Sequence, residues 1–102
     1  MPYLIEILLP ATENHGRITG DVRYADAVDT LVRTFGGLTA FTRSPADGWW
    51  DGPRGETLDR IVIVEVIAPS LDRQWWQQFR SRLETAFRQQ RIVVRAQEIE
   101  LL

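Results

Sequence analysis

The chain of 102 residues contains no cysteine, no lysine and a single histidine, His15. Without cysteine there is no disulfide, no thiol nucleophile and no thiolate zinc site. Without lysine, Schiff-base catalysis and the phosphate-binding lysine of a P-loop are excluded. One histidine is too few for a two-histidine metal site within one chain, so we expect no metal and no cofactor. Any chemistry must come from carboxylates, arginines, tyrosines, hydroxyl groups or His15.

Charge and length narrow the class of protein further. The 14 acidic residues and 12 arginines leave a formal charge of −2, which gives no reason to expect a nucleic acid or an acidic membrane as partner. The length suits one domain over residues 1–102. No apolar run is long enough to cross a membrane, and Met1–Glu6 lacks the features of a signal peptide. We therefore expect a cytoplasmic protein.

Four apolar or alternating segments predict strands. The β-branched run Arg60–Ile67 is too apolar for a solvated strand and too poor in helix formers for a helix. Alternation predicts a second central strand over Tyr3–Leu9, ended by Pro10. The two further strands are predicted over Leu38–Arg43 and from Ile92 to about Glu98.

Two amphipathic segments predict helices. The first covers about residues 22–35, with Asp21 as N-cap and Gly36-Gly37 at its end. Its apolar face repeats at three- and four-residue steps through Ala25, Val28, Leu31, Val32 and Phe35. The second helix follows the N-cap Asp72, and its buried stripe contains Trp75 or Trp76, Phe79, Leu83, Ala86 and Phe87.

The order β-α-β-β-α-β predicts a ferredoxin-like α+β fold. Right-handed crossovers place the first and third strands in the centre of an antiparallel sheet, with both helices on one face. The segment Ser44–Asp59, rich in glycine and proline, is predicted to be a long connecting loop.

The opposite, helix-free face of this sheet is predicted to be apolar. Alternation places six large side chains on it, which are Leu4, Leu8, Ile61, Ile63, Ile67 and Val93. Such a patch exceeds what a monomer usually leaves in water. Two coverings stay open: a second copy of the chain packed sheet to sheet, or the 44–59 loop folded over the face. We expect a homodimer.

This order of elements with an apolar open face resembles the dimeric α+β barrel superfamily. The resemblance covers the whole chain and depends on architecture, without a matched motif. It implies two sheets that face each other across a dimer axis. Its relatives include small-ligand sensors and cofactor-independent isomerases and monooxygenases. A small, partly apolar ligand, bound between sheet and helices or at the dimer cleft, or such an activity is therefore expected. A protein interaction module is a further alternative.

Three charged residues fall on the open face of adjacent strands: Glu6, Glu65 and Arg95. In one interpretation they form a polar patch in an apolar cavity, where Glu65 or Glu6 acts as general acid or base or binds a ligand. In the other, Glu6 and Arg95 form a structural ion pair that sets register or dimer geometry.

The remaining candidates are aromatic or lie in loops. Trp49 and Trp50 would form either a lid over a ligand or a packing anchor, and Phe41 would lie on either face of its strand. His15 is a catalytic candidate if its loop reaches the cavity and is otherwise a solvated loop residue. The arginines of the second helix suggest a solvated face, and the third strand lacks the aromatics of an RNA-binding sheet.

Overall fold

A computed structural model describes residues 1–10, 21–52 and 55–102 of the chain. It describes only the backbone at residues 42–47, 50–52 and 55–59. His15 and the side chain of Trp50 therefore lie outside the described residues, and their predicted roles stay predictions.

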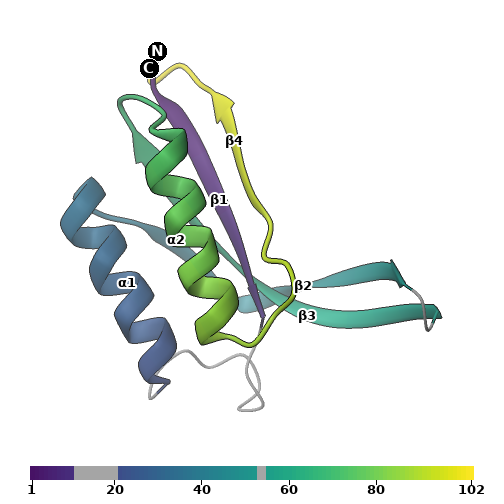
Figure 1. Cartoon of the computed structure of the whole chain (residues 1–102). Helices are drawn as coiled ribbons and strands as arrows, with labels where there is room; N and C mark the ends of the chain where they lie inside the picture. Colours follow the sequence, from purple (N-terminus) through teal and green to yellow (C-terminus); the bar gives the residue numbers. More distant parts are fainter. Residues whose placement is uncertain (11–20, 53–54) are drawn as a thin grey trace.

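The elements follow the predicted order β-α-β-β-α-β (Figure 1). They are β1 (Tyr3–Pro10), α1 (Val22–Phe35), β2 (Thr39–Gly52), β3 (Gly55–Ala68), α2 (Arg73–Ala86) and β4 (Val94–Glu98). The strands form one antiparallel sheet in the order β2-β3-β1-β4, with β1 and β3 in the centre. Both helices lie on one face of the sheet. The ferredoxin-like α+β prediction is confirmed.

The helix ends lie where the cap residues predict them. The Asp21 carboxylate accepts a hydrogen bond from the backbone N–H of Arg23 at 2.9 Å and so satisfies one free donor of the first turn of α1. Asp72 does the same for Trp75 at the start of α2. Gly36 ends α1 in the left-handed region at φ 87°, a conformation that glycine adopts without a steric penalty.

The core lies between the helices and one face of the sheet. Every second residue of the central strands is buried there, namely Ile5, Ile7 and Leu9 of β1 and Val62, Val64 and Val66 of β3. The helices contribute Tyr24, Ala27, Leu31, Trp76, Phe79 and Leu83. The strand residues match the predicted inward positions, because alternation assigns a strand's two faces unambiguously once one of them is buried. The predicted buried face of α1 is only partly right, because Ala25 and Val32 are exposed and Tyr24 and Ala27 are buried instead.

An aromatic cluster joins the two helices at the start of α2. Phe35 stacks on Trp76 and meets Trp75 edge-on, with ring centroids 5.2 Å apart in both pairs. Trp75 in turn stacks on Phe79 at 5.0 Å. Trp76 is buried, which confirms that at least one of the paired tryptophans belongs to the core.

The prediction of a loop over residues 44–59 is wrong. β2 and β3 continue through this segment as one long hairpin, which projects from the domain (Figure 1). Backbone pairing carries the strands outward as far as Gly52 and Gly55, because cross-strand hydrogen bonds do not depend on side-chain pattern. Pro45 falls at a register shift between Phe41 and Ala46, where an irregular ladder tolerates proline.

Two smaller corrections concern the faces of the sheet. Ile61 is only 6% exposed, although alternation placed it on the open face; it pairs with Pro10, next to the register shift of β2. Ala96 has the parity of the helix-covered face but is exposed. It lines a space between β4 and α2 that neither element fills.

Candidate functional site

A row of polar residues crosses the helix-free face of the sheet, which we call the open face. Strand register places Thr39, Glu65, Glu6 and Arg95 directly beside one another on β2, β3, β1 and β4. Residues opposite each other in a sheet lie on the same face, so the three charged candidates of the sequence are neighbours. We call this set of four residues the polar row.

One ion pair holds the β1–β4 end of the polar row. The Arg95 Nε donates to Glu6 Oε1 at 3.0 Å, and the side chains are 56% and 22% exposed. A pair this open to water contributes little stability, about 0–1 kcal/mol. Glu65 is the direct neighbour of Glu6 on β3, and like charges opposite each other destabilise a sheet. The row therefore carries one negative charge more than its arginine balances.

Apolar residues flank the polar row on both sides. Leu4 pairs with Ile67 in the row on one side, and Leu8 pairs with Ile63 in the row on the other. Phe41 extends the second of these rows on β2 and is 46% exposed, which assigns its side chain to the open face. Ile67 is 45% exposed. The open face is thus a polar stripe between two apolar stripes.

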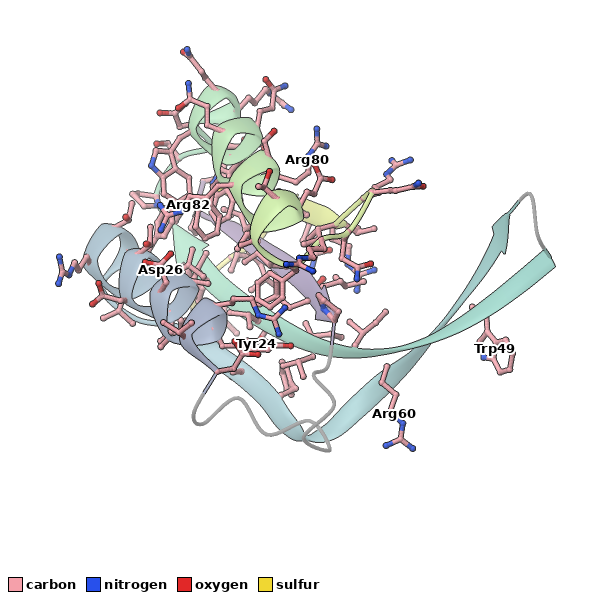
Figure 2. The ribbon with its side chains drawn as sticks, turned by 60° about the horizontal axis from the view of Figure 1, so that its bottom comes forward. Tyr24, Asp26, Trp49, Arg60, Arg80 and Arg82 are labelled. Carbon is pink, nitrogen blue, oxygen red and sulfur yellow. The ribbon has the colours of Figure 1, made fainter. Side chains whose placement is uncertain are left out.

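Trp49 of the hairpin is not part of this arrangement. Trp49 lies on the projecting part of the β2–β3 hairpin, away from the labelled residues of the helices (Figure 2), and it is 65% exposed. It pairs in register with Leu58 beyond the shift that follows Phe41. The structure brings together Glu6, Glu65, Arg95 and Phe41, and places Trp49 outside this group.

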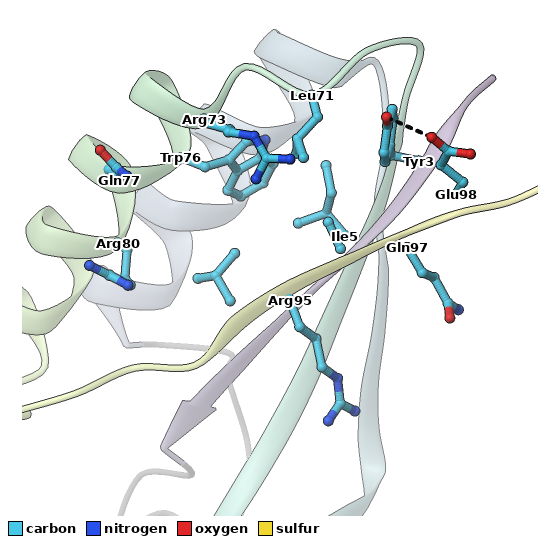
Figure 3. A pocket seen from close by; sticks show the side chains of 12 residues that line it. Tyr3, Ile5, Leu71, Arg73, Trp76, Gln77, Arg80, Arg95, Gln97 and Glu98 are labelled. Atoms are coloured by element: carbon cyan, nitrogen blue, oxygen red, sulfur yellow. Dashed lines mark hydrogen bonds between the residues drawn. The ribbon is translucent and has the colours of Figure 1, made fainter.

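A cavity of about 530 Å³ opens on the other side of the sheet, between α2 and β4 (Figure 3). Its apolar lining includes Ile5, Leu71, Trp76 and Val94, and its polar lining includes Arg73, Gln77, Arg80 and Glu98. The sequence left a ligand site between sheet and helices open as one of two locations, but it assigned none of these α2 residues to it. The signal was the spacing of Arg73, Gln77 and Arg80, which places all three on one stripe of α2 beside Trp76.

The expectation that the arginines of α2 form a solvated face holds only in part. Arg82 reaches across to α1, where its guanidinium lies 2.6 Å from Asp26 Oδ2 and 3.0 Å from the Thr30 hydroxyl (Figure 2). Arg80 is half-buried, and its Nε is shielded from water without a hydrogen-bond partner among the described residues. Two of these cations therefore have structural surroundings that a helical-periodicity argument does not reveal.

The two tyrosines have different environments. Tyr3 donates its hydroxyl to Glu98 Oε1 at 3.0 Å, and this hydrogen bond to a carboxylate raises the tyrosine pKa. Tyr24 is buried and donates to the carbonyl oxygen of Pro10. Burial raises the pKa of Tyr24 to about 12. A hydroxyl engaged in this way inside the core serves the fold and is not available to an external substrate.

Among the described residues no group of three or more histidine, cysteine or carboxylate side chains is placed to hold a metal ion. Within the same part of the chain, none of the helices combines the length and the apolar character needed to cross a membrane.

Comparison with known proteins supports the fold alone. No protein family model matches the chain, and no curated protein matches its sequence. Among solved structures, the chain is similar to the divalent cation tolerance protein CutA1 from Thermus thermophilus, with a TM-score of 0.63 over 97% of this chain and 84% of that protein. Sequence identity is 10%, so the likeness concerns architecture and carries no residue roles. The chain is a small α+β domain of ferredoxin-like fold.

Proposed function

We propose that this chain forms a homodimer through the open face and binds a small, partly apolar molecule in the cleft between the two sheets. The observation that carries the proposal is the polar row, which lies between two apolar rows on the face of the sheet opposite α1 and α2.

The apolar rows supply the reason for association. Ile67 and Phe41 are nearly half exposed, and Leu4, Leu8 and Ile63 are incompletely buried on the same face. Removing each such side chain from water contributes roughly 1.5–3 kcal/mol when burial is complete. A second copy presents the same stripes, so a two-fold arrangement can pair apolar rows with apolar rows.

The charges of the polar row suit a second copy as well. Within one subunit Arg95 is already paired with Glu6, whereas Glu65 has no basic neighbour in its row. A two-fold axis along β1 brings Arg95 of one copy toward Glu65 of the other. The two rows together still carry an excess of carboxylate, which favours a ligand with an amine or another hydrogen-bond donor beside an apolar body.

The assembly is tested by measuring mass in solution. Light scattering of the wild-type chain is expected to give a dimer. Ile67→Arg places a charge on the open face and is expected to give monomers, because an unpaired buried charge is costly. Val22→Arg, at a position 77% exposed on α1, is the matched control and leaves the mass unchanged. A wild-type chain that stays monomeric at every concentration contradicts the proposal. A complex of the chain with a different protein would instead indicate a protein interaction module.

Ligand binding is tested separately with phenethylamine and hexylamine as probes. The melting temperature of the wild-type dimer is expected to rise with either amine. Glu65→Gln removes the charge without changing size, and it is expected to abolish this rise while the dimer mass stays the same. Asp29→Asn, on the exposed side of α1, is the control. An equal rise in all three proteins would contradict a site at the polar row.

A further inference from the structure

The cavity between α2 and β4 exists because the sheet is wider than its helical cover. β4 is an edge strand of five residues, and its inward-facing Ala96 is too small to fill the space beside α2. Trp76 and Ile5 form part of the apolar lining, and both are buried. The volume of about 530 Å³ lies within the roughly 300–1,000 Å³ typical of small-molecule sites. This cavity is on the opposite side of the sheet from the open face.

Positive charge dominates the lining of this cavity. Arg73 and Arg80 come from one stripe of α2, and Arg95 contributes from β4 with its charged end directed away from α2 toward Glu6 (Figure 3). Glu98 is the one acidic residue among the lining residues, and it already accepts the Tyr3 hydroxyl. An anion entering the cavity therefore meets two guanidinium groups and one carboxylate that is already hydrogen-bonded.

Arg80 is the less exposed of the two α2 arginines that line the cavity. Its Nε is buried and has no acceptor among the described residues, although buried N–H groups in folded proteins are nearly always hydrogen-bonded. Arginine presents planar, paired donors that match the two oxygens of a carboxylate. The guanidinium groups of Arg80 and Arg73, two turns apart on α2, and the apolar lining together describe a ligand with a charged end and an apolar body.

We propose that the cavity between α2 and β4 is a binding site for a small organic carboxylate, with Arg80 and Arg73 holding the carboxylate and Trp76 contacting the apolar body. The site lies between α2 and β4, shares Arg95 of β4 with the polar row, and does not require a dimer.

The first test uses phenylacetate and octanoate as probes and NMR of the tryptophan indole N–H groups as readout. Single Trp→Phe variants assign the signals. Saturable shifts of the Trp76 signal, with the exposed Trp49 signal unmoved, are expected. Phenylacetamide, which lacks the charge, is expected to cause no saturable shift. Equal shifts with the amide, or no saturable shift at millimolar carboxylate, overturn the proposal.

The second test assigns the charge to its residues. Arg80→Met keeps an unbranched apolar stem and removes the guanidinium group, and Arg73→Gln changes an exposed position where folding is not at stake. Each is expected to weaken probe binding about tenfold or more, as loss of a charged hydrogen bond predicts. Arg60→Gln, an exposed arginine on β3 outside the cavity, is the control (Figure 2). Unchanged affinity in both cavity variants refutes the assignment.

Binding to Ile67→Arg separates this site from the proposed function. Retained carboxylate binding in that variant supports a site within one subunit, whether or not the wild-type chain is a dimer. Loss of binding together with loss of the dimer would place the probe at the interface and overturn the present assignment.

Discussion

Replacement of Tyr24 by phenylalanine tests how one buried hydroxyl joins α1 to β1. The Tyr24 side chain is 1% exposed, and its ring meets Phe87 edge-on with centroids 5.0 Å apart. Its hydroxyl donates to the carbonyl oxygen of Pro10, the last residue of β1. Tyr24→Phe keeps the ring and its packing and removes only the donor.

The magnitude follows from what each substitution removes. Loss of the hydroxyl removes a part-buried hydrogen bond to the Pro10 carbonyl, so the free energy of unfolding should fall by about 1–2 kcal/mol. For a domain of this size that lowers the melting temperature by about 4–16 °C. Tyr24→Ala also removes the ring from the core and from Phe87, and should cost about 3–5 kcal/mol. The difference between the two variants separates the hydrogen bond from the packing.

The pH dependence gives an independent check. The folded pKa of Tyr24 is about 12, above the ordinary value of 10.0, so the folded state favours the protonated phenol. The stability that this shift contributes is complete below pH 10 and is lost as pH rises through about 12. The phenylalanine variant has no such group. The stability gap between wild type and Tyr24→Phe should therefore shrink above pH 10.

Urea unfolding followed by circular dichroism measures both effects, and tyrosinate absorbance reports the ionisation directly. Two results would refute the reasoning. One is equal stability of wild type and Tyr24→Phe at neutral pH. The other is ionisation of Tyr24 at the ordinary pKa in the folded protein, which would mean that its hydroxyl is in water.

Three further predictions use the same unfolding measurement. Gly36→Ala should lower the free energy of unfolding by about 1 kcal/mol, because φ is 87° at this position. Gly37→Ala should lower it clearly less, because Gly37 has no positive φ and no atom lies within 4 Å of an added Cβ. Equal losses would contradict the role of Gly36 as the left-handed end of α1. Arg82→Ala should cost at most about 1 kcal/mol, and the cost should shrink with added salt because its contact with Asp26 is exposed; a salt-independent loss would argue against an ionic contribution. Trp49→Ser should change stability by less than about 0.5 kcal/mol, and a larger loss would mean that this exposed ring packs against something.

Much of the fold follows from local patterns in the sequence. Asp21 and Asp72 begin the helices and Gly36 ends the first, because backbone groups at helix ends need partners that only certain residues provide. Alternation in Tyr3–Pro10 and Ile61–Ala68 assigns the buried face of each central strand. The prediction that Glu6, Glu65 and Arg95 share one face agrees with their places in the sheet register, since parity and strand order are enough to align them.

Features that depend on how elements meet in space were decided only by the tertiary structure. The glycines and prolines of residues 44–59 predicted a loop, but pairing between β2 and β3 overrode that local preference. The α2–β4 cavity depends on how far the helix reaches over the edge strand, and the lack of an acceptor for the Arg80 Nε depends on which groups pack around it. Periodicity describes which side of an element a residue occupies. The distance to the next element, which decides whether a residue is covered, arises only when the whole chain packs.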